Sequence, residues 1–112
     1  MDLSKSDKKV ARELIEKGLE TEFEEGLSEF ADIIADWQSG KTSIKDSYYG
    51  LFKSVAEFDK HIGRRYDRMR GSNYFWIVLQ LFVDKKIPVS EMDRFSPDVQ
   101  MRFRFLIEEP EG

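Results

Sequence analysis

Apolar residues recur every three or four positions along two long stretches of this chain, and this spacing constrains the fold more than any other feature. The first stretch covers about residues 19–39, where the apolar positions are Leu19, Phe23, Leu27, Phe30, Ile33, Ile34 and Trp37. The second covers about residues 42–70, where they are Ile44, Tyr48, Leu51, Phe52, Val55, Phe58, Ile62, Tyr66 and Met69. A period near 3.6 residues places such side chains on one face of a helix. Both stretches are therefore predicted to be long amphipathic α-helices.

Helix start and stop signals flank these two stretches. Gly40 stands where a helix C′ residue is expected, and Thr42 or Ser43 suits the N-cap of the second helix. Upstream, a short apolar stripe of Val10, Leu14 and Ile15 predicts a helix from about Ser4 or Ser6 to Lys17. Gly18 either ends that helix or lies inside a longer one.

Residues 73–84 are apolar almost all round, from Tyr74 to Val83 with only Gln80 between. Their aromatic and β-branched residues would suit a strand, but no strong second strand exists nearby to pair with it. We therefore expect a helix that is buried on every side, or one whose outer face meets another subunit.

The C-terminal region has two start signals. Ser90 with Asp93 predicts a short turn through Phe95, and Ser96-Pro97-Asp98 predicts the start of a helix because proline is favoured at the first helical position. In residues 99–107, apolar and polar side chains also alternate with the period of two that is typical of a strand, but the start signal at Ser96-Pro97-Asp98 favours a helix. The fold class predicted is all-α, a compact bundle of four to five helices with short connections. It forms a single domain over residues 1–112, with frayed ends at 1–5 and 109–112.

Composition excludes several classes of protein. The chain has 112 residues and is 40% hydrophobic, which is enough for one core without a metal or disulfides. It has no cysteine, so disulfides, a thiolate nucleophile and cysteine metal sites are excluded, and a cytoplasmic location fits. The N-terminus lacks the pattern of a signal peptide, and the apolar run 74–83 is too short to cross a bilayer. We expect no membrane association.

Charge is unevenly distributed along the chain. Residues 1–40 carry 5 basic and 11 acidic side chains, residues 41–72 carry 8 and 4, and residues 73–112 carry 5 and 7. Five of the acidic residues share one face of the first long helix: Glu22, Glu25, Glu29, Asp32 and Asp36. Projection at about 100° per residue turns this acidic stripe about 120° away from the apolar face, so it is expected to look outward into solvent. A metal-dependent hydrolase that uses these carboxylates is the third of our functional hypotheses.

A basic stripe lies on the second long helix. It comprises Lys53, Lys60, Arg64 and Arg68, with Arg65 adding local charge. Such a face can neutralise phosphates, which makes nucleic acid or a phosphate-rich ligand a possible partner. Glu57 and Asp67 interrupt the stripe, and the protein as a whole has a net charge of −4, unlike most nucleic-acid-binding domains. Nucleic-acid or phosphate binding is therefore the second hypothesis.

Two single residues on the second long helix are candidates for chemistry. His61 lies at the edge of the apolar face, with Glu57 and Arg65 one turn away, where a carboxylate can orient a general base. Neither a nucleophile nor a second catalytic group accompanies it, so an exposed or paired histidine is the preferred interpretation. Asp59 projects inside the apolar stripe, between Val55 and Ile62, so a buried carboxylate with a hydrogen-bonding partner is expected.

No catalytic or cofactor motif is present: the chain lacks a glycine-rich dinucleotide loop, a P-loop, a nucleophile elbow and a paired-histidine metal motif. We expect no cofactor and no metal, and the chain is interpreted as a non-catalytic helical protein-interaction module. Apolar residues exceed what one small core needs, so the partner expected is a second copy, as a homodimer, or another protein. Trp76, Met101 and Phe105 are the predicted interface residues.

Overall fold

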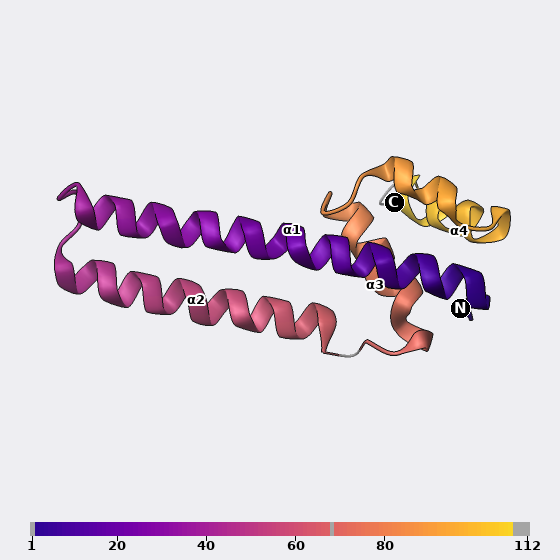
Figure 1. Cartoon of the computed structure of the whole chain (residues 1–112), viewed down its shortest axis with the longest axis horizontal. Coiled ribbons are helices and arrows are strands. Elements are labelled where there is room, and N and C mark those ends of the chain that lie inside the picture. The colour runs from indigo at the N-terminus through magenta and orange to yellow at the C-terminus, as the bar shows by residue number, and fades with distance from the viewer. Residues whose placement is uncertain (1, 68, 109–112) are drawn as a thin grey trace. The chain divides into compact units, whose positions relative to one another are not determined.

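The computed structural model describes residues 2–67 and 69–108, which form four α-helices and two short 3-10 helices (Figure 1). The α-helices are α1 (Lys5–Gln38), α2 (Ile44–Tyr66), α3 (Tyr74–Val83) and α4 (Pro97–Glu108), and the 3-10 helices are η1 (Gly71–Asn73) and η2 (Val89–Arg94). The described residues include no strand, which confirms the all-α class and makes residues 99–107 helical. The predicted frayed end at 109–112 lies outside the described residues. None of the helices described has both the length and the apolar character needed to cross a bilayer.

The packing divides the chain into two compact units that share α1. The described parts of residues 1–21 and 68–112 form the first unit, and residues 22–67 form the second. One continuous helix therefore contributes to both, and the single-domain organisation stays a prediction.

Gly18 lies inside α1 rather than at the end of a shorter helix. A Cβ atom at this position would lie 2.7 Å from Cδ1 of Leu81, so the glycine allows α3 to pack directly on the α1 backbone. The N-terminal segment is also anchored. Leu3 lies in the stretch predicted to fray, yet its side chain is buried in the first unit.

The first unit has an aromatic and aliphatic core of its own. Its largest fully buried side chains are Leu14, Ile15, Phe75, Val78, Leu81 and Phe103. The rings of Phe75 and Phe103 stack with centroids 4.4 Å apart, which joins α3 to α4. The prediction of a buried helix near residues 73–84 is therefore confirmed for most of α3, although Trp76 and Val83 are about half-exposed.

A buried carboxylate fixes the start of α4. Asp7 accepts a hydrogen bond from the backbone N–H of Ser96 at 2.9 Å and one from the Ser96 hydroxyl at 2.7 Å. Burial acts to raise the pKa of Asp7, but these bonds and one to Ser4 outweigh it and hold the pKa below its usual value. The helix start predicted at Ser96-Pro97 is confirmed, since α4 begins at Pro97.

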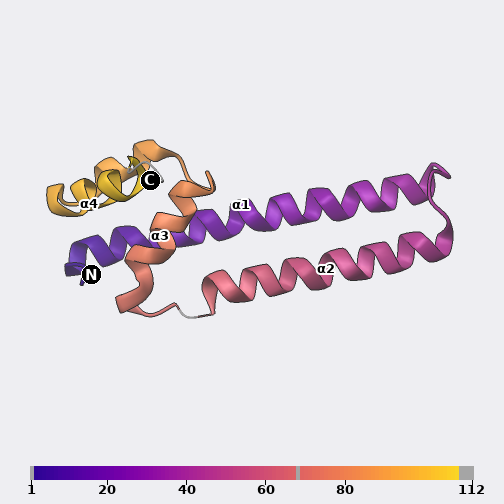
Figure 2. The same cartoon turned by 180° about the vertical axis from the view of Figure 1, so that it is seen from behind.

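The second unit is a hairpin in which the later part of α1 and the whole of α2 run side by side in opposite directions (Figures 1 and 2). The Ser43 side chain accepts a hydrogen bond from the Asp46 backbone N–H at 3.1 Å, which confirms Ser43 as the N-cap of α2. Gly40, in the turn, has a φ of 81°, the left-handed region that favours glycine. We call this unit the hairpin and its turn, residues 39–43, the tip.

Candidate interaction face

The two helices of the hairpin approach each other closely at Gly26. A Cβ atom at this position would lie 2.7 Å from the ring of Phe58, so the Phe58 ring packs against the bare α1 backbone. Phe23 and Phe30 flank the same ring, with centroids 6.4 Å and 5.7 Å away. The line of contact on α1 therefore passes through Gly26.

One turn before Gly26, the carboxylate of Glu22 is buried between the helices, and the residue is only 2% exposed. His61 Nε2 lies 2.6 Å from its Oε1, and the Tyr66 hydroxyl donates to its Oε2 at 2.5 Å. Arg65 adds an ion pair, with Nε 3.3 Å from Oε2. We call Glu22, His61, Arg65 and Tyr66 the polar cluster. These three side chains of α2 compensate the buried charge of Glu22, two by hydrogen bonds and Arg65 by its charge, which fixes the register of the two helices.

The polar cluster also changes the titration of Tyr66. Burial raises the pKa of its hydroxyl far above the usual value, and the hydrogen bond to Glu22 and the charge of that carboxylate raise it further. Tyr66 is therefore a neutral donor at any physiological pH. His61 was expected to be exposed or paired, and its partner is Glu22 on α1 rather than Glu57 on its own helix.

The expected outward orientation of the acidic stripe is wrong for one of its five residues. Glu22 is buried against α2, whereas Glu29 is exposed and accepts a hydrogen bond from the Ser54 hydroxyl at 3.1 Å. The reason is that α1 contacts α2 along the side that carries Glu22 and Gly26, and its apolar stripe meets α2 only at one edge, as at Phe23 and Phe30. Among the residues described, no group of three or more histidine, cysteine or acidic side chains is arranged to hold a metal ion.

Because the contact line lies to one side of the apolar stripes, most of both stripes is uncovered. Four large apolar side chains on each helix are between 39% and 77% exposed: Phe23, Leu27, Ile34 and Trp37 on α1, and Ile44, Tyr48, Phe52 and Val55 on α2. We call these eight residues the apolar face. On α1, with the half-buried Phe30, they step by four, three, four and three residues, which is the spacing of a coiled-coil seam.

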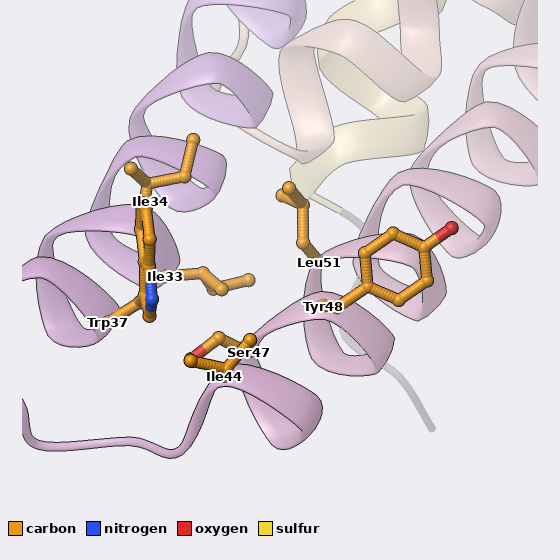
Figure 3. A pocket seen from close by; sticks show the side chains of 7 residues that line it. All are labelled: Ile33, Ile34, Trp37, Ile44, Ser47, Tyr48 and Leu51. Carbon is orange, nitrogen blue, oxygen red and sulfur yellow. The ribbon is translucent and has the colours of Figure 1, made fainter.

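The apolar face is hollowed near the tip of the hairpin. A cavity of about 330 Å³ lies between the helices there (Figure 3). Its walls are almost wholly aliphatic and aromatic, formed by Ile33, Ile34, Trp37, Ile44, Ser47, Tyr48 and Leu51. A cavity of this size can receive one or two apolar side chains from another helix.

Asp59 was expected to be buried with a hydrogen-bonding partner, and this is wrong because the residue is exposed. It does share a side of α2 with Val55, as predicted, but that side belongs to the apolar face and is not covered by α1. Water therefore solvates the carboxylate. Asp59 marks the point, away from the tip, where the apolar face ends on α2.

The structure places three of the five residues of the predicted phosphate-binding stripe on the exposed surface of α2. Lys53, Lys60 and Arg64 are exposed on α2, and Lys53 lies 4.0 Å from Glu57. Arg65 turns to Glu22 instead, and Arg68 lies outside the described residues. Phosphate binding by this stripe stays a prediction.

The predicted interface residues Trp76, Met101 and Phe105 are all substantially exposed, and all three belong to the first unit. The larger exposed apolar set, on the hairpin, was not among the predicted interface residues. The available signal was the length of the stripes: a pair of helices can cover only the sides that face each other, so two long stripes need a further partner.

No protein-family model matches the chain, and no curated protein or solved structure matches it.

Proposed function

We propose that this chain is a cytoplasmic, helical protein-interaction module and that the apolar face of the hairpin is its binding surface. The observation that carries the proposal is the exposure of eight large apolar side chains on one face of a two-helix unit. The lack of cysteine supports the cytoplasmic location, since nothing in the chain requires an oxidising compartment.

The size of the apolar face supports a contact with another protein. Its eight side chains leave an apolar area on the order of 900 Å² uncovered, whereas a monomeric protein rarely exposes a contiguous patch of more than a few hundred Å². One partner in a typical specific complex buries about 800 Å². The exposed area is therefore that of one complete protein interface.

The composition of the face also suits a binding surface. Phe23, Trp37, Tyr48 and Phe52 are aromatic, and large aromatic residues are the usual anchors of protein interfaces. The polar cluster holds the two helices in a fixed register, so these anchors are ordered before a partner arrives.

Site-specific photo-crosslinking in the source cells tests this proposal. A photoreactive phenylalanine analogue at Leu27 or Phe52, within the face, is expected to form protein adducts in the folded protein. The same analogue at the exposed positions Ser28 and Gly50, on the other side of the same helices, is the control. Adducts from all four positions alike, or none from Leu27 and Phe52, would contradict the proposal.

A further inference from the structure

We infer that the occupant of the apolar face is a second copy of this chain, and that two hairpins form a four-helix bundle in which α1 of each copy lies antiparallel on α2 of the other. This inference rests on the proposed function and names the partner and its orientation. It follows from the charge of the two helices, the position of two edge residues and the area of the face.

The helices of the hairpin carry opposite net charge. Residues 22–38 of α1 have six acidic side chains and no basic one, a net of −6. The α2 helix has five basic and three acidic side chains, a net of +2. A surface that contains its own electrostatic complement can bind a copy of itself, since a two-fold axis can place each helix on its opposite.

Two ways of stacking one apolar face on another obey two-fold symmetry. An axis parallel to the helices places α1 on α2 of the other copy, with both tips at the same end. An axis perpendicular to the helices, in the plane between the hairpins, places α1 on α1 and the tips at opposite ends. Glu22 is paired with Arg65 inside its own hairpin, which leaves residues 23–38 of α1 with a net charge of −5. The second arrangement brings two such stretches together, so charge favours the first.

Two charged residues at the outer edges of the apolar face, Glu24 and Lys60, also support the arrangement in which both tips lie at the same end. Successive helical residues advance by about 100°. On α1, Glu22 points to α2, Phe23 lies on the apolar face, and Glu24 lies at its outer edge. On α2, Phe58 points to α1, and Lys60, two residues later, lies at the corresponding outer edge.

These two edge residues also lie at the same height along the bundle. Within the hairpin, Gly26 is level with Phe58, and Glu29 is level with Ser54. When both tips lie at the same end, residues that are level within one hairpin are also level between the two copies. Glu24 of one copy therefore faces Lys60 of the other. Both residues are exposed, and the symmetric dimer contains this pair twice.

The area is sufficient for a stable dimer. Two apolar faces together bury on the order of 1,800 Å², within the range of about 1,200–2,000 Å² for specific complexes. The aliphatic and aromatic cavity near the tip then receives side chains from the facing helix of the second copy.

Sedimentation equilibrium of the full chain tests the inference. The wild type is expected to have twice the 13.2 kDa mass of one chain at micromolar concentration. Leu27→Glu with Phe52→Glu is expected to give a monomer that keeps its helical circular dichroism. Ser28→Glu with Gly50→Glu adds the same charge to exposed positions on the other side of the same helices and is expected to leave a dimer.

Charge exchange tests the orientation without touching apolar residues. Glu24→Lys and Lys60→Glu, each alone, are expected to weaken the dimer roughly two- to thirtyfold, because two exposed ion pairs are lost. The two together are expected to restore it. A tighter dimer with Glu24→Lys would instead indicate α1 on α1 and would overturn the orientation.

A wild-type chain that stays monomeric at 100 µM would overturn the second-copy inference. The proposed function would still stand if photo-crosslinking at Leu27 and Phe52 captured a different protein. It would fail only if those positions gave no adducts specific to the face.

Discussion

Glu22 is buried between α1 and α2, where it contacts three donor side chains, those of His61, Arg65 and Tyr66. Its carboxylate is the one acceptor that these three side chains share. At the scale of single residues, the register of the hairpin therefore depends on Glu22.

Replacing Glu22 tests this dependence. Glu22→Ala removes the carboxylate and leaves the largely buried Arg65 guanidinium without it, so the free energy of unfolding is expected to fall by about 3 kcal/mol. Asp32→Ala removes an exposed carboxylate from the same helix and is expected to change it by less than about 0.5 kcal/mol. Urea denaturation measures both. A similar, small loss for the two variants would show that the polar cluster does not hold the hairpin.

The raised pKa of Tyr66 predicts a dependence of stability on alkaline pH. The folded-state pKa lies above the ordinary value of 10.0, so the neutral tyrosine is favoured by folding. Its contribution is fully present below pH 10 and is lost as the pH rises beyond it. We expect the difference in unfolding free energy between wild type and Tyr66→Phe to shrink steadily above pH 10. A difference that stays constant to pH 11 would contradict this role.

At the scale of elements, the packing of α1 on α2 depends on the absence of a side chain at Gly26. Gly26→Ala is expected to destabilise the protein by about 1–3 kcal/mol, because the new methyl group meets the Phe58 ring. Gly50→Ala is the matched control, since a Cβ there meets nothing within 4 Å. It is expected to stabilise α2 by up to about 1 kcal/mol. Thermal denaturation measures both variants. Equal changes in their melting temperatures would contradict the close approach of α1 and α2 at Gly26.

The positions of the helices were largely predictable from sequence. The N-cap at Ser43 and the start at Ser96-Pro97 are local features, and both are confirmed. The continuity of α1 through Gly18 was not, because a glycine can either end a helix or lie inside one. In the structure Gly18 lies inside α1, and Leu81, distant in sequence, packs on the backbone there.

The polar cluster and the apolar face could not be predicted for a related reason. Periodicity finds an apolar stripe such as Phe23, Leu27 and Ile34, but it does not say which side of a helix another helix covers. That choice is made by the fit of Phe58 onto Gly26, which turns Glu22 inward and leaves the apolar stripe outside. The sequence pattern therefore predicted Glu22 in solvent and did not identify the apolar stripe as an exposed face.

At the scale of the whole molecule, the two units differ in how well they satisfy their apolar residues. The first unit buries its own aromatic core, whereas the hairpin leaves eight large apolar side chains uncovered. We infer that a second hairpin completes this second unit. Folding of the hairpin and dimerisation are then linked, and the apparent stability should rise with protein concentration.

The distance between the two hairpin tips in solution tests this account most directly. The chain has no cysteine, so Lys41→Cys provides a single spin-label site in the tip. Pulsed electron resonance is expected to give a label-to-label distance below about 25 Å, since both tips lie at one end of a bundle of helix-sized spacing. A distance near one α2 length, roughly 35 Å, would contradict the orientation, and the absence of any dipolar signal would contradict the dimer itself.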